Sequence, residues 1–127
     1  MATIGRLSDT LTIRVYDERE SIIEPHFHLT KGRDGTFNFQ TCLCIKYNKY
    51  YFHTIKGQII KEKSMKLSKR QLKEIDSFLR EKDELGISNW QILLRQWNLE
   101  NSGSFHKLSL NLPQPDFKKL NGSIIEI

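Results

Sequence analysis

The chain has few cysteines and no long hydrophobic run, and each shortage excludes a class of protein. Only two of its 127 residues are cysteines, far fewer than a small disulfide-stapled secreted domain carries. No apolar stretch approaches the roughly 18 residues that a membrane-spanning helix requires. The first residues, Met1 to Arg6, also lack the basic and then apolar layout of a secretory signal. We therefore expect a cytoplasmic protein that does not enter a membrane.

Length and composition predict one core. A chain of 127 residues with 38% hydrophobic content is long enough for one domain and too short for two. We expect an α+β domain over residues 1–101 and an extended C-terminal tail over residues 102–127. The tail would dock on the domain or lie at an interface, where it would support a homodimer.

The net charge is moderately positive. Lysine and arginine total 20 and the acidic residues total 15, which gives +5. This excess permits attraction to an acidic protein partner or to RNA without requiring either.

Alternation of apolar and polar residues predicts an antiparallel sheet in the first half of the chain. An Asp-Gly pair within Lys31–Gly35 favours a hairpin turn, and a second turn is expected at residues 48–49. Strands are expected over Leu11–Tyr16, Pro25–Thr30, Phe37–Ile45 and Tyr50–Thr54, with a possible fifth over Gly57–Lys61. The result is a meander of about four or five strands.

After the expected strands, apolar residues recur at steps of three and four, which is typical of helices. Ser68 and Gln71, and again Ser88 and Gln91, have the spacing of a capping box, in which the serine and the glutamine each bond the other's backbone N–H. Helices are therefore expected to begin after Ser68 and after Ser88, with Gly86 ending the first helical segment. Their apolar stripes are Leu72, Ile75 and Leu79, and Trp90, Leu93, Leu94 and Trp97. Both stripes should pack on the sheet.

Two histidines lie two residues apart in the second expected strand. Because alternate residues of a strand point to the same face, His26 and His28 should share one face while Phe27 and Leu29 enter the core. We expect the histidine face to point outward.

The expected strand register adds neighbours to this pair. Matching of the apolar faces sets His26 opposite Cys42, and a two-residue turn at residues 48–49 sets Cys44 opposite His53. One face would then collect His26, His28, Cys42, Cys44 and His53.

The order of landmarks resembles a family of small bacterial proteins of unknown function that have a Pro-His-Phe-His strand, a hairpin, a helix and a second helix containing Asn-Trp. Here the landmarks are Pro25–His28, Leu67–Arg70 and Asn89-Trp90. The likeness covers about residues 11–98. Members are often encoded beside another small protein in gene pairs suggestive of toxin–antitoxin modules. The resemblance therefore implies a partner protein and an RNA-directed or regulatory role.

Histidine catalysis is one interpretation of the polar face. His26, His28 and His53 would divide general-base and general-acid roles in cleaving RNA, whose 2′-hydroxyl is an internal nucleophile. Lys46 or Arg14 would stabilise the developing negative charge. In the alternative, the histidines only form hydrogen bonds on a polar strand face.

A metal site is a second interpretation. His26 and His28 would bind zinc together with His53 or with the thiolate of Cys42 or Cys44. A slip of one residue in either hairpin would separate these side chains. Zinc is the one cofactor that the sequence suggests, and we otherwise expect none.

Partner binding is a third interpretation, and it requires fewer specifically placed residues than catalysis or a metal site. Aromatic and basic side chains that would stack on bases or meet an acidic partner are Arg14, Tyr16, Lys46, Lys49, Tyr51 and Lys56. Leu108, Leu110 and Leu112 favour association through the tail. We favour a small binding module of a toxin–antitoxin-type or regulatory pair, acting through a protein or RNA, over an enzyme. A histidine-based ribonuclease, a metal-binding protein and a mobile-element inhibitor of a host defence system are the alternatives.

Overall fold

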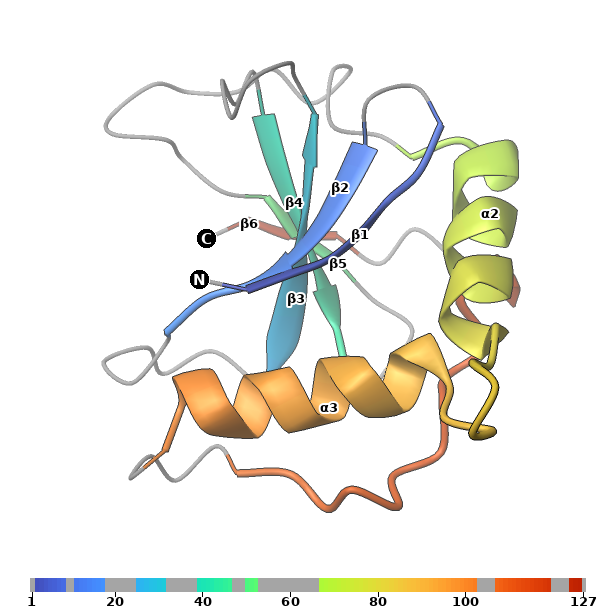
Figure 1. The fold of residues 1–127 in the computed structure, drawn as a ribbon. Helices are drawn as coiled ribbons and strands as arrows, with labels where there is room; N and C mark the ends of the chain where they lie inside the picture. Colours follow the sequence, from blue (N-terminus) through green and yellow to red (C-terminus); the bar gives the residue numbers. More distant parts are fainter. Residues whose placement is uncertain are drawn as a thin grey trace.

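The computed structural model describes residues 2–8, 11–17, 25–31, 39–46, 50–52, 67–102, 107–119 and 124–126. In these segments a six-stranded sheet packs with two α-helices and one short 3-10 helix, which confirms the expected α+β class (Figure 1). The strands are β1 (Ala2–Arg6), β2 (Leu11–Val15), β3 (His26–Lys31), β4 (Phe39–Cys44), β5 (Tyr50–Phe52) and β6 (Ile124–Glu126). The helices are α2 (Lys69–Arg80), α3 (Asn89–Glu100) and η1 (Phe117–Lys119).

The strand order follows the chain, β1-β2-β3-β4-β5-β6. Strands β2 to β5 form the expected antiparallel meander, and β1 adds a further antiparallel strand beside β2. Strand β6 lies parallel to β5, with Tyr50 opposite Ile124. Neither β1 nor β6 was expected, because Ala2–Arg6 contains a glycine and little alternation, and three residues are too few to show a period. The expected strand over Gly57–Lys61 lies outside the described residues.

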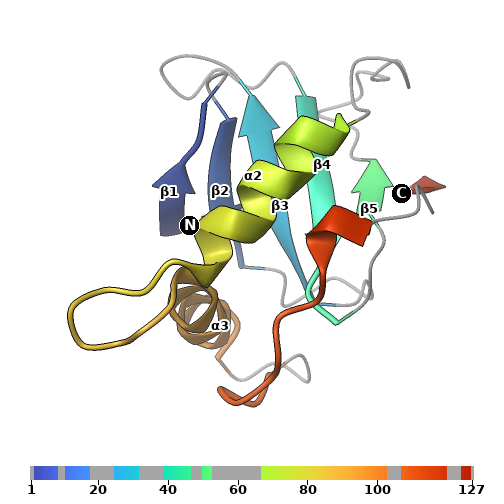
Figure 2. The same cartoon turned by 90° about the vertical axis from the view of Figure 1, so that its right-hand side faces the viewer.

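One face of the sheet forms the main core. Leu11, Ile13 and Val15 of β2 lie beside Phe27 and Leu29 of β3, and all five are buried. Helix α2 crosses this face (Figure 2) and buries Leu72, Ile75 and Leu79. The rings of Phe27 and Phe117 meet edge to face with centroids 5.5 Å apart, so η1 completes the same layer.

Helix α3 runs past one end of the strands (Figure 1). Both helices begin as expected, because Ser68 and Ser88 each form a complete capping box with the glutamine three residues later. The expected stripe of α3 is buried throughout, namely Trp90, Leu93, Leu94 and Trp97. Near its C-terminal end, the Asn101 side chain donates to the carbonyl of Tyr16 at 3.1 Å and so ties α3 to the end of β2.

The connection between the helices begins earlier than expected. Helix α2 ends at Arg80, and Gly86 instead occupies the following loop with a φ of 79°. The Asp83 carboxylate accepts hydrogen bonds from the backbone N–H groups of Leu85 and Ile87, both at 2.9 Å. Hydrogen bonds between a side chain and the backbone of its own loop favour a turn over a helix, so α2 ends before Gly86.

The turn after β1 is tied to α2 by a carboxylate. The backbone N–H and the hydroxyl of Ser8 donate to the two oxygens of Glu74, at 2.6 and 2.5 Å. These hydrogen bonds lower the pKa of Glu74, because they favour its charged form. None of the described helices is long and apolar enough to cross a membrane.

A substitution at Gly5 tests the close approach of β1 to α2. A β-carbon at Gly5 would collide with the ring of Phe78, so Gly5→Ala should lower the free energy of unfolding by about 1–3 kcal/mol. Urea unfolding followed by circular dichroism measures this loss. Adding Phe78→Leu should recover part of it, whereas additive losses in the double variant would contradict the contact.

Candidate functional site

The histidine face is buried, and the expectation that it points outward is wrong. His26 has 0% and His28 has 4% of its surface exposed. The polar residues beside them in β2 and β3, Thr12, Arg14 and Thr30, are buried as well. Both faces of β2 and β3 are therefore covered, whereas strict alternation had suggested one wet face.

Aromatic side chains pack around the two imidazoles. The ring of His26 lies 5.8 Å from that of Trp97 on α3 and 5.1 Å from that of His28, measured between centroids. Tyr16 meets His28 edge to face at 4.4 Å. Because α3 runs past the end of the sheet, its second tryptophan, Trp97, contacts His26 on the polar face of β3.

The observed register also differs from the expected one. His26 pairs with Cys44 and His28 with Cys42, a shift of two residues that keeps the cysteine positions on the histidine face. Cys42 in turn pairs with Tyr51, so Cys44 is not set opposite His53. The register of β3 with β4 differs from the expected one by two residues, and that of β4 with β5 differs by four, so the register that a two-residue turn at residues 48–49 would set is not observed. Even-numbered shifts keep each side chain on its face, so the alternation in the sequence does not distinguish them.

Three further candidates lie beside the histidines, because Arg14 pairs with His28, the ring of Tyr16 packs on His28 and Cys44 pairs with His26. Arg14 and Cys44 are buried, Tyr16 is half-buried and Lys46 is exposed. Cys42 and Tyr51 occupy paired positions of β4 and β5, and Lys49, His53 and Lys56 lie outside the described residues. The described part of the chain gathers no three histidine, cysteine, aspartate or glutamate side chains that would hold a metal ion.

A buried imidazole contributes to stability through packing. We expect His26→Ala to lower the free energy of unfolding by about 2–4 kcal/mol, because the truncation leaves a cavity beside Trp97. Urea unfolding followed by circular dichroism gives this value. Lys46→Ala, at an exposed position just after β4, should change it little. Equal stability of the His26 variant and the wild type would contradict burial of the ring.

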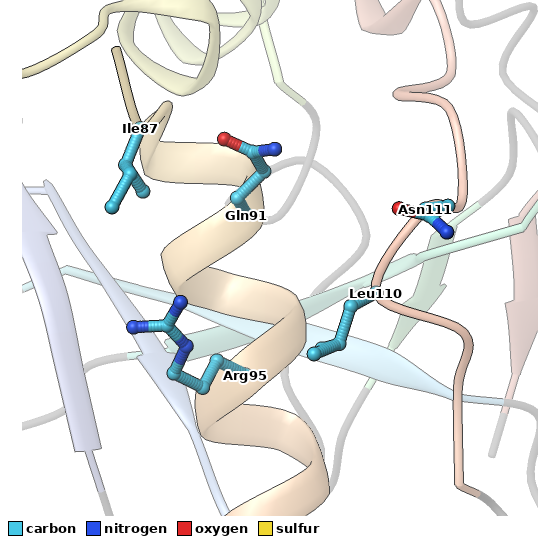
Figure 3. Close-up of a pocket in the computed structure, with 5 residues that line it drawn as sticks. All are labelled: Ile87, Gln91, Arg95, Leu110 and Asn111. Carbon is cyan, nitrogen blue, oxygen red and sulfur yellow. The ribbon is translucent and has the colours of Figure 1, made fainter. Parts of the chain in front are cut away.

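A second candidate surface lies on the outer side of α3, where the chain returns as residues 107–112. Gln91 and Arg95 lie one turn apart on α3, Ile87 lies just before the helix, and the side chain of Leu110 points toward α3 from the returning segment (Figure 3). These residues and Asn111 line a hollow of about 140 Å³. An adjoining hollow of about 290 Å³ shares Gln91, Leu110 and Asn111 with it. We call this surface the α3 groove.

Side-chain hydrogen bonds fix the returning segment against α3. Asn98 bonds both backbone groups of Leu108: its side-chain oxygen accepts from the N–H and its NH2 donates to the carbonyl, each at 2.8 Å. The Trp90 indole N–H donates to the carbonyl of Leu112 at 2.8 Å. Both walls of the α3 groove are therefore held in place by groups of α3 itself.

Asp76 fixes the chain beyond the groove. Its buried carboxylate accepts from the side chain of Arg80 at 2.8 and 3.4 Å, from that of Gln114 at 3.1 Å and from the backbone N–H of Phe117 at 3.1 Å. Hydrogen bonding to this carboxylate raises the pKa of Arg80. One charged group of α2 thus bonds three parts of the chain at once.

We expect Asp76→Ala to release residues 107–119 from the helices. The loss of several charge-assisted hydrogen bonds, and a buried Phe117 N–H left without its acceptor, should cost about 2–4 kcal/mol of unfolding free energy. Hydrogen exchange should show faster exchange at Phe117 and Leu112. The exposed acidic control Glu84→Gln should leave both measurements unchanged. Unaltered exchange at Phe117 in the Asp76 variant would contradict the proposed anchoring.

Large apolar side chains remain exposed around α3. Leu99 has 63% and Leu110 has 49% of its surface exposed, while Leu85, in the loop before α3, has 84%. Arg95 and Leu99 are exposed at successive turns of the helix. The sequence offered one signal that was missed: Leu99 falls outside the buried stripe of α3, where a polar residue is the usual occupant.

No protein-family model, curated protein or solved structure gives a significant match to this chain. The resemblance to the Pro-His-Phe-His family stays a prediction based on the order of its landmarks.

Proposed function

We propose that this protein is a small cytoplasmic binding module that acts through a protein partner, as one component of a toxin–antitoxin-type or regulatory pair. The α3 groove and the neighbouring Leu99 form its binding surface. The observation that carries the proposal is the exposure of Leu110 in the lining of a groove whose two walls are joined by hydrogen bonds, together with the exposure of Leu99 one helical turn beyond Arg95.

The choice of surface follows from the positions of the two candidates. Exposed leucines that flank a hollow are typical of a surface that a partner covers. The polar strand face, in contrast, is packed under aromatic rings. Binding through Arg14 and Tyr16, as the sequence suggested, would require a partner to open this packing.

The same burial disfavours the ribonuclease alternative. General acid–base catalysis requires the catalytic group to lie within hydrogen-bond reach of the substrate. His26 and His28 expose almost none of their surface, so a phosphodiester would reach them only after displacement of neighbouring chain. A mobile-element inhibitor of a defence system remains compatible with the groove, because such a protein would also act by covering a partner.

Native mass spectrometry of the tagged protein isolated from its own cells tests the proposal. We expect a second protein mass in the wild type and its loss in Leu99→Asp/Leu110→Asp, because a buried carboxylate opposes an apolar contact. The matched control is Leu85→Asp, which adds a charge at a more exposed leucine in the loop before α3 and should keep the partner.

The outcomes separate the competing functions. A wild type that carries no second protein, or a partner that survives the double substitution at the groove, would contradict the proposal. A bound RNA mass in place of a protein would favour the RNA-binding alternative. A zinc-sized mass that disappears in His28→Ala would favour the metal-binding alternative instead.

A further inference from the structure

We infer that the α3 groove recognises an acidic and aliphatic peptide segment, with a carboxylate of the partner bound by Arg95 and an aliphatic side chain placed against Leu110. This inference rests on the proposed function and names the chemistry of the partner.

The charged side chains among the described lining residues of the α3 groove are all positive. Arg95 lines the smaller hollow and Lys82 lines the larger one, and neither hollow has a carboxylate among its described lining residues. No hydrogen bond or ion pair of Arg95 occurs within the described part of the chain. Arginine favours carboxylates, because its planar guanidinium donates two parallel hydrogen bonds. A partner with a negative charge at this point completes the pairing.

The apolar side chains select an aliphatic neighbour for that charge. Leu110 points toward α3 (Figure 3) and lines the same hollow as Arg95, and Leu99 follows Arg95 by one helical turn. A carboxylate on Arg95 would therefore have apolar surface close by. An extended peptide with aspartate or glutamate two residues away from a leucine presents both side chains on the same face.

Amide side chains supply the remaining polar contacts. Gln91 uses its side-chain oxygen to accept from the Ser88 N–H at 2.9 Å, which leaves its NH2 group directed to the groove lining. Asn111 stands opposite on the returning segment and is exposed. Side-chain amides both donate and accept, so they suit the backbone of an extended peptide.

A nucleic acid fits this surface less well. Binding to a phosphate backbone is stabilised by many cations along a track, and single strands stack on exposed aromatic rings. The described lining of each hollow has a single cation. Trp90, the one aromatic residue that lines the larger hollow, is buried in the core.

The test compares two peptides that differ only in charge. The full-length ¹⁵N-labelled protein is titrated with acetyl-Leu-Ser-Asp-Ser-Leu-amide, in which the leucines and the aspartate share one face of an extended chain, and with its neutral isostere acetyl-Leu-Ser-Asn-Ser-Leu-amide, and amide shifts are followed by NMR. We expect the acidic peptide to bind about tenfold more tightly, as one charge-assisted pairing implies, with shifts at Gln91, Arg95 and Leu110. Arg95→Gln should remove the preference. Lys73→Gln, which removes the same charge from an exposed position on α2, should retain it.

Equal affinity of the two peptides, shifts that map elsewhere, or a preference that survives Arg95→Gln would overturn the inference. So would a ten-nucleotide uridine oligomer that binds the same residues more tightly than the acidic peptide. The proposed function fails separately: if the native complex depends on Leu99 and Leu110 but tolerates Arg95→Gln, the partner binds the groove without an acidic anchor.

Discussion

The position of residues 107–119, which contain the returning segment, depends on the buried carboxylate of Asp76. It holds Gln114 and Phe117 against α2, and Phe117 in turn reaches the rings of Phe27 and Trp90. The segment that precedes Phe117 is therefore anchored at its far end by α2 and along its length by Asn98 and Trp90 of α3. A buried charge with several donors is stable only in this full arrangement, since the loss of any donor leaves part of the charge uncompensated. The α3 groove exists because these bonds fix its second wall.

Local signals in the sequence were sufficient to predict the helices and most of the sheet. The two capping boxes mark the first residues of α2 and α3, and the apolar stripes name the residues that those helices bury. The alternation of β3 correctly grouped His26 with His28 and Phe27 with Leu29. Alternation reports which residues share a face, but the cover on each face comes from segments far away in the chain. Burial of the histidines beside Trp97 was therefore not predictable from the strand alone.

The candidate site shows the same division between local and distant information. Arg95 and Leu99 are visible in the sequence as residues outside a buried stripe, yet the groove also needs Leu110 and Asn111, which follow in an irregular segment. The hydrogen bonds from Asn98 and Trp90 hold that segment beside the helix. The polar strand face, which offered more conventional chemistry, is occupied by the packing of the core. The proposed binding function uses the surface that the core leaves exposed.

The parallel pairing of β5 with β6 determines the order in which the sheet can be completed. Each antiparallel pair from β1 to β5 joins strands that are consecutive in the chain, whereas β6 is separated from β5 by both helices. Contacts between distant segments form late, since closing a long loop costs entropy before the contact is gained. Before Ile124–Glu126 pairs with it, β5 is the edge strand of the described sheet. A strand edge with unpaired N–H and C=O groups can pair with another chain, so β6 protects the sheet from pairing with a second molecule.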